Sequence, residues 1–227
     1  MKKVLLFNNE FYQKYYIRKF LYLLAKEKYH NQVLFACIGT PLSYYNNYFD
    51  IFGPVVGHLL QKYNNNSDIH ILGTINAPIH AKTLEYQHII DYLKNPNYLI
   101  IGLDACIDIN VNRYLLWSEG FQPGLGVDKD FPKISDGVMF GCTSDFDPTE
   151  IIIDYAIDNK DEMIGFAMNF AYTIVKCLFE PNYIDPNRDY VEIYYLIEQY
   201  KIEQRVDYNV FHPAYKRLMK EIEKLPN

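Results

Sequence analysis

Two aspartates stand where a folded chain could use them chemically. Asp104 closes the apolar run LIIGLDAC (99–106), and Asp50 opens the segment DIFGPVVG, just before a predicted helix. Burying a carboxylate is costly unless it is paired, hydrogen-bonded or protonated, so Asp104 either caps a turn or does chemistry at a strand tip. Asp50 has a simpler alternative, since an Asp before a helix often caps its N-terminus. Two carboxylates that converge on one water could act as base and acid in peptide hydrolysis.

His80 follows the loop GTINAPI, directly after a predicted strand. A lone His in a loop is more often a hydrogen-bonding partner of its neighbours than a ligand. Its place near the presumed functional edge makes it a candidate for substrate binding or, with Asp50 and Asp104, for holding a divalent metal. Cys106 could act as a nucleophile with His80, although packing is the more common role of such a thiol.

A second candidate for substrate binding is the loop QPGLGVDKDFP, which contains Gly124, Gly126 and Lys129. It lacks the GK[ST] sequence of a phosphate-binding loop, and no helix follows it at once. The simplest interpretation is a constrained turn. Beside the two carboxylates, such a turn could also hold a substrate backbone.

Alternating strands and helices must position these residues. We expect strands over 32–39, 68–74, 98–105, 113–120 and 136–142, and helices over 10–29, 51–63, 81–95 and from about 148 to 179. This order predicts an α/β fold with a largely parallel sheet, whose ligands gather at the carboxyl ends of the strands. We expect an α/β domain over 1–180 and a helical C-terminal extension over 181–227, which begins with two prolines.

Composition and charge narrow the function classes. The chain has 227 residues, 49% of them apolar and 22% charged, as in ordinary globular proteins. A net charge of −6 argues against nucleic-acid binding. The apolar stretch of MKKVLLF is too short for a signal peptide, and no segment is apolar over a membrane-spanning length. The four cysteines show no C-x-x-C pairing, so we expect reduced thiols and a cytoplasmic protein.

Several motifs together resemble the YyaC family of spore-forming bacteria, a sporulation family of the DUF1256 type. That family is similar in turn to the germination protease that degrades small acid-soluble spore proteins, and more remotely to the hydrogenase maturation proteases. The resemblance covers roughly residues 31–179. It is carried by five segments in the family's order, CIGT (37–40), DIFGPVVG (50–57), GTINAPIHAK (73–82), IIGLDAC (100–106) and QPGLGVDKDFP (122–132).

The resemblance implies a three-layer αβα fold of the phosphorylase/hydrolase-like kind. It also implies that Asp50 and Asp104 are the active pair, because they match the two aspartates assigned to the germination protease. The P-G-x-G-V segment of that protease has its match at 123–127. The nickel ligands of the maturation proteases do not transfer, because their His comes later in the chain than His80 does. This chain departs from the family in a longer loop, PLSYYNNYF (41–49), a difference that bears on the choice of substrate more than on the fold.

We therefore expect a spore-associated peptidase that uses an aspartate pair on a peptide or protein substrate, without a metal or other cofactor. Two alternatives stay open: a non-catalytic sporulation or peptide-binding protein on the same fold, and a metal-dependent hydrolase. The resemblance places the protein in the forespore or the mother cell. We expect neither nucleic-acid nor membrane partners, and self-association stays open.

Overall fold

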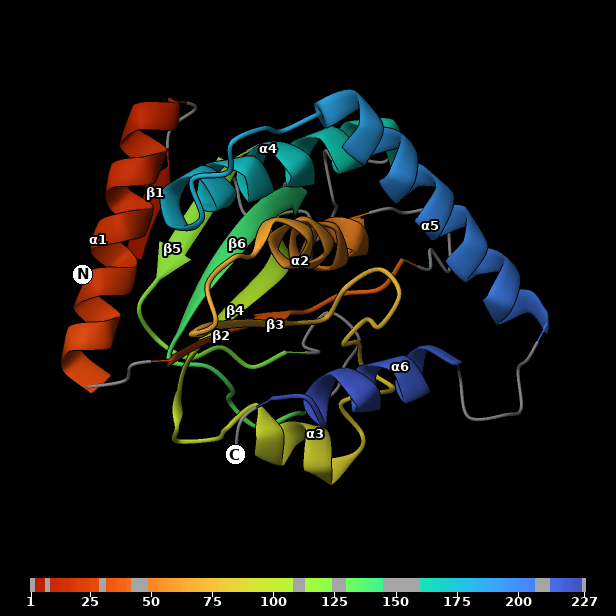
Figure 1. The fold of residues 1–227 in the computed structure, drawn as a ribbon. Coiled ribbons are helices and arrows are strands. Elements are labelled where there is room, and N and C mark those ends of the chain that lie inside the picture. The colour runs from red at the N-terminus through yellow and green to blue at the C-terminus, as the bar shows by residue number, and fades with distance from the viewer. Residues whose placement is uncertain are drawn as a thin grey trace, which may run out of the picture.

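A six-stranded sheet forms the centre of the molecule (Figure 1), with the strand order β1-β5-β6-β4-β2-β3. The computed structural model describes residues 3–6, 9–28, 32–41, 49–107, 113–123, 130–144, 160–206 and 213–225. The strands are β1 (Lys3–Leu6), β2 (Gln32–Cys37), β3 (Ile69–Leu72), β4 (Tyr98–Ile107), β5 (Arg113–Trp117) and β6 (Gly137–Ser144). Strands β3, β2, β4 and β6 are parallel to one another, and β5 runs antiparallel to β6. Strand β1 pairs antiparallel with β5 and so runs in the direction of the parallel strands.

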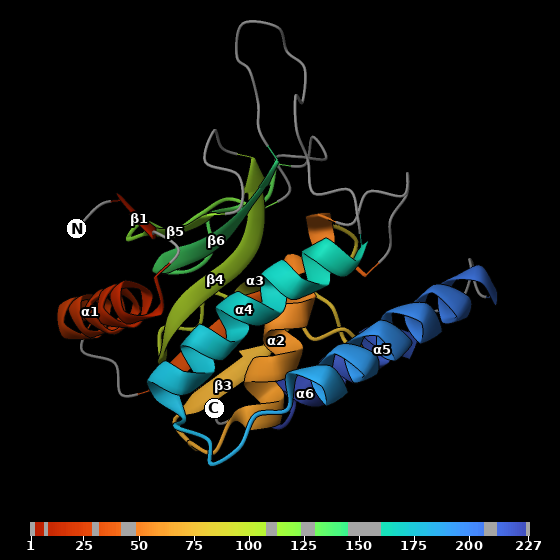
Figure 2. The same cartoon turned by 90° about the horizontal axis from the view of Figure 1, so that it is seen from above.

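Helices cover both faces of the sheet (Figure 1), and Figure 2 looks onto one of these faces. Helices α1 (Glu10–Lys28), α2 (Phe52–Tyr63) and α4 (Lys160–Leu178) enclose one apolar core with the sheet, and α5 (Pro186–Val206) packs against α2 and α4. Helices α3 (Gln87–Tyr92) and α6 (Pro213–Ile222) cover the opposite face. Side chains along β4 alternate between the two cores, because successive residues of a strand point to opposite faces. The predicted α/β fold with a C-terminal helical extension is confirmed.

Several elements differ from the sequence-based expectation, and three of the differences bear on the fold or the site. The edge strand β1 was not predicted, because four residues carry too little periodicity to be recognised without their partner β5. The predicted helix over 81–95 is reduced to α3, since the Thr83 hydroxyl bonds the main chain of His80 and ties the preceding residues into turns. Strand β4 runs to Ile107, two residues beyond the expected end. The part of the last predicted helix over 148–159 lies outside the described residues.

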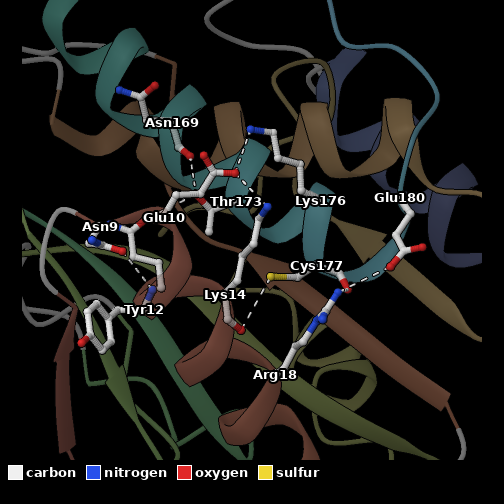
Figure 3. A network of polar contacts seen from close by, with 11 residues as sticks. Asn9, Glu10, Tyr12, Lys14, Arg18, Asn169, Thr173, Lys176, Cys177 and Glu180 are labelled. Carbon is white, nitrogen blue, oxygen red and sulfur yellow. Dashed lines mark hydrogen bonds and ion pairs between the residues drawn. The ribbon is translucent and has the colours of Figure 1, made fainter.

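Helix α1 is fastened to α4 by charged and polar contacts (Figure 3). The Asn9 side chain caps α1, since its Oδ1 accepts the Tyr12 N–H at 3.2 Å. The Glu10 carboxylate binds Lys14 at 2.8 Å and Lys176 of α4 at 3.0 Å.

None of the described helices is long and apolar enough to cross a membrane.

A buried carboxylate fastens α5 to the rest of the fold. Asp189 is 1% exposed, and it accepts hydrogen bonds from Lys62 Nζ at 2.7 Å, the Tyr63 hydroxyl at 2.7 Å and the Tyr172 hydroxyl at 2.8 Å. Burial alone would raise the pKa of Asp189, but these bonds outweigh it and hold the pKa below its ordinary value. We call these four residues the Asp189 network. Because each donor comes from α2 or α4, the network fixes the first turn of α5.

The last helix, α6, packs on the opposite face. Leu218 is fully buried in the core of that face, and Arg217 Nε donates to the Asn76 carbonyl at 2.6 Å. The Glu221 carboxyl is partly buried, and its Oε2 has no hydrogen-bond partner among the described residues. Burial raises the pKa of Glu221 to about 7. The described parts of the extension therefore pack on both faces of the sheet.

Candidate active site

The carboxyl end of β2 is the centre of the candidate site, and Gly39 lets Asp50 approach it. Gly39 has a φ of +140°, and a Cβ there would lie 2.1 Å from the Asp50 carbonyl oxygen. Only glycine fits a backbone conformation and a close approach of this kind. The next residue, Thr40, donates its N–H to the same carbonyl at 2.9 Å. The glycine of CIGT is therefore what allows the chain segment with Asp50 to pack on the strand end.

Two further glycines hold α2 against the sheet. A Cβ at Gly53 would lie 1.9 Å from the Ile38 carbonyl oxygen, and one at Gly57 would lie 2.5 Å from the Gly73 carbonyl oxygen. Residues four apart on a helix share one face, so the two glycines form a smooth strip against β2 and the loop after β3. The G-P-x-x-G spacing in DIFGPVVG therefore serves close packing beside Asp50.

Phe52 fixes the start of α2 from the other side. Its ring lies over Gly141 of β6, where a Cβ would come within 2.4 Å of a ring carbon. The same ring packs against Phe166 and Phe170 of α4, with centroids 5.6 and 5.8 Å away, and against Tyr114 at 6.4 Å. An isolated glycine in a strand often marks such a close approach. Sequence reasoning missed Phe52 and Gly141, although the glycine inside the strand pattern was a usable signal.

Asp50 lies in a single 3₁₀ turn, Phe49–Ile51, that leads into α2. The alternative in which Asp50 simply caps this helix is wrong: the cap residue is Ile51, without a side-chain hydrogen bond. The Asp50 side chain is partly exposed, so it is not sealed inside the core. The turn thus holds Asp50 beside the end of β2.

Asp104 lies within β4, at the level where β2 ends. The Ile38 N–H donates to the Leu103 carbonyl at 2.7 Å, and Asp104 itself lies opposite Phe140 of β6. The expectation that Asp104 ends its strand needs correction, because β4 continues along β6 while β2 stops. The loss of the β2 neighbour leaves the side chain partly exposed at this edge.

The charge of Asp50 acts on the carboxyl of Asp104. Burial raises the pKa of Asp50 to about 7, and the nearby Thr40 backbone lowers it only in part. Burial also raises the pKa of Asp104 well above its ordinary value, and the negative charge of Asp50 raises it further. The Ala105 N–H, which donates to Asp104 Oδ1 at 2.8 Å, opposes this shift. The pair can therefore hold one carboxylic acid and one carboxylate near neutral pH.

His80 lies at the same edge, in the loop after β3. Gly39 donates its N–H to the Ile79 carbonyl at 2.8 Å, which places His80 beside the end of β2. The ring accepts the Lys82 N–H at Nδ1, at 3.2 Å, so the neutral ring carries its proton on Nε2. These contacts match the simpler expectation of a His that hydrogen-bonds within its loop, and its role in substrate binding stays a prediction.

The other candidates from the sequence are the loop residues Gly124, Gly126 and Lys129, a possible metal site, and Cys106. Gly124, Gly126 and Lys129 lie outside the described residues. No three His, Cys, Asp or Glu side chains within the described ranges are grouped as a metal site requires, so Asp50, Asp104 and His80 do not form one in this arrangement. Cys106 Sγ lies 3.6 Å from Cys142 Sγ of the neighbouring strand.

Comparison with known proteins identifies the family of this chain. Over 106 residues the chain is 30% identical to "Uncharacterized protein YyaC" of Bacillus subtilis (strain 168), an alignment that covers 46% of this chain and 49% of that relative. The aligned part thus spans about half the length of that relative. No solved structure matches the chain. The model of the family described as "Protein of unknown function (DUF1256)" matches residues 6–177, which includes α1, the strands β2 to β6 and both candidate aspartates. The chain belongs to the DUF1256 family, to which the motifs of its sequence had pointed.

Proposed function

We propose that this protein is a peptidase in which Asp50 and Asp104 activate a water molecule for attack on a peptide bond. The observation that carries the proposal is the placement of two partly buried carboxyls at the carboxyl edge of a parallel sheet, where the charge of Asp50 raises the pKa of Asp104. Pairs of titratable groups whose surroundings separate their pKa values are typical of acid–base catalysis. Carboxyl edges of such sheets are also where α/β proteins bind their ligands.

The two carboxyls take different roles in this mechanism. The charge of Asp50 raises the pKa of Asp104, so Asp104 keeps its proton while Asp50 is ionised. Asp50 then accepts a proton from water as general base, and Asp104 donates its proton to the peptide as general acid. The Ala105 N–H donates to Oδ1 of Asp104, so we assign the transferable proton to Oδ2. The rate should rise as the pH passes about 7, where Asp50 ionises, and fall when Asp104 loses its proton.

The test uses the full chain and a peptide mixture prepared by digesting a bacterial proteome, with products identified by mass spectrometry. We expect new peptide termini with the wild-type protein and at least a 100-fold lower rate with Asp50→Asn and Asp104→Asn. Both substitutions preserve shape, so circular dichroism should show unchanged secondary structure. Asp68→Asn is the matched control, since Asp68 is exposed at the start of β3.

Three outcomes would contradict the proposal. Cleavage at the wild-type rate by folded Asp50→Asn or Asp104→Asn would show that the carboxyls do not catalyse the reaction. Binding of peptides without cleavage by the wild-type protein, also in the presence of added divalent metals, would favour the peptide-binding alternative. Cleavage that appears only with an added metal would favour the metal-dependent one.

A further inference from the structure

A pair of cysteine thiols lies on the same sheet as the candidate site, outside the proposed chemistry. Cys106 of β4 and Cys142 of β6 are directly opposite each other in parallel register, with their sulfur atoms 3.6 Å apart. A disulfide needs a sulfur separation of about 2.05 Å, so side-chain rotations that shorten the distance by about 1.5 Å would be enough. Residues paired in neighbouring strands already lie at the backbone separation that a disulfide tolerates.

The two thiols differ in exposure, which suits a reaction in two steps. Cys106 is partly exposed, whereas Cys142 is fully buried. Cys106 is therefore the more accessible of the two to a solvent oxidant, and Cys142 is placed to attack it from inside. The other two cysteines are unsuited: Cys37 and Cys177 lie in the core of the opposite face. Burial also raises the pKa of the Cys177 thiol to about 11 and that of Cys37 further, so neither thiol ionises readily.

We propose that Cys106 and Cys142 form a reversible oxidation site, at which a hydroperoxide converts the two thiols into a disulfide. The Cys106 thiolate attacks the peroxide oxygen, the O–O bond breaks, and a sulfenic acid and an alcohol or water result. The Cys142 sulfur then attacks the Cys106 sulfur, the S–O bond breaks and water leaves. Two thiols are oxidised and one peroxide is reduced in total. A small thiol reverses the reaction by disulfide exchange.

A disulfide between Cys106 and Cys142 would affect the strands next to the candidate site. Cys106 comes two residues after Asp104, on the same face of β4, and the pairing of β4 with β6 shifts register directly after Cys106. A disulfide at this irregularity would tie the two strands together next to Asp104. Because the bond joins residues 36 positions apart in the chain, it should raise the melting temperature by on the order of 5–10 °C.

The experiment treats the full-length reduced protein with hydrogen peroxide and counts the thiols that remain. We expect two of four thiols to be lost and then restored by dithiothreitol. Mass spectrometry of a non-reduced digest should find Cys106 joined to Cys142 within one chain. The Cys177→Ala variant is the matched control and should form the same bond. In Cys142→Ala, Cys106 should instead be trapped as a sulfenic acid by dimedone.

Mapping of the disulfide in the wild-type protein tests the proposal even if a variant fails to fold. The proposal is overturned if Cys106 in the wild-type protein accumulates as sulfenic or sulfinic acid while Cys142 stays reduced. It is equally overturned if the peroxide leaves all four thiols intact, or joins other cysteines or separate chains. None of these results depends on peptidase activity, so this proposal and the proposed function can fail separately.

Discussion

Replacing Asp50 by Asn should make the protein more stable at alkaline pH, although it should abolish activity. The Asp50 carboxyl is held beside the end of β2, where burial favours its neutral form. The folded state therefore binds the proton more tightly than the unfolded state does. As the pH rises from the ordinary pKa of 3.8 through the folded value of about 7, the unfolded chain gives up this proton first, and folding loses stability. Asn cannot ionise, so the variant avoids that loss.

The size of the stabilisation by Asp50→Asn follows from the difference between the folded and the ordinary pKa of Asp50. The folded and ordinary pKa values of 3.8 and about 7 differ by about three units, and each unit corresponds to about 1.36 kcal/mol. The full effect is thus about 4 kcal/mol above pH 7, and it vanishes below pH 4. Because the side chain is partly exposed, solvent relaxation should reduce it to on the order of 2 kcal/mol. For a chain of this size, that raises the melting temperature by roughly 4–8 °C.

The assay compares urea unfolding of the wild-type protein and Asp50→Asn at pH 4.5 and pH 8. The free-energy difference between the two proteins should increase by about 2 kcal/mol from the lower to the higher pH. Any constant cost of placing the Asn amide in the site cancels in this comparison. Asp68→Asn, at an exposed position, should show no such increase.

A difference between wild type and Asp50→Asn that stays constant from pH 4.5 to pH 8 would refute the reasoning. Asp50 would then titrate as an ordinary surface carboxyl, and the assignment of general base and general acid would lose its physical ground. A difference that increases toward low pH would contradict it more directly, because that sign requires a lowered pKa.

Further predictions concern packing and the extension. Asp189→Asn should lower the unfolding free energy by about 2–4 kcal/mol in urea melts, because it leaves the donors of the Asp189 network without their charged acceptor. Val191→Ala, exposed on the same helix, should change it by less than about 0.5 kcal/mol. Gly57→Ala should cost at least about 2 kcal/mol, because the methyl group would meet the Gly73 carbonyl. Gly165→Ala is the control, because open space surrounds its Cβ position, and it should raise the unfolding free energy by up to about 1 kcal/mol in the same urea melts. Equal changes in the unfolding free energy for the two variants would refute the packing role of Gly57. Glu221→Gln should stabilise the protein at pH 8 but not at pH 4, as followed by thermal melting, since the pKa of Glu221 is raised to about 7.

Local patterns in the chain were sufficient to predict much of the fold. The spacing of apolar residues predicts α1 and α2 almost to the residue, and the apolar runs predict β2, β3 and β4. These signals work because each element is long or apolar enough to reveal which side it buries. The motifs with Gly39 and Gly73 likewise pointed to one edge of the sheet, because strand order alone puts carboxyl ends together.

Other features arise only when distant segments meet. The short strand β1 exists because β5 pairs with it, and α3 is short because a threonine hydroxyl competes for the backbone before it. The role of Phe52 depends on Gly141, a residue in another strand that leaves room for its ring. A pattern in one segment cannot report a partner that lies many residues away.

By itself the sequence determined the α/β class, the order of the main elements and the two aspartates as candidates. Only the tertiary structure decided that Asp50 does not cap its helix, that Asp104 lies inside β4, and that the charge of Asp50 acts on Asp104. It also brought Cys106 and Cys142 together. The physical reason is the same in each case: a pKa shift or a sulfur–sulfur contact depends on burial and distance across strands, and neither quantity is local in the chain.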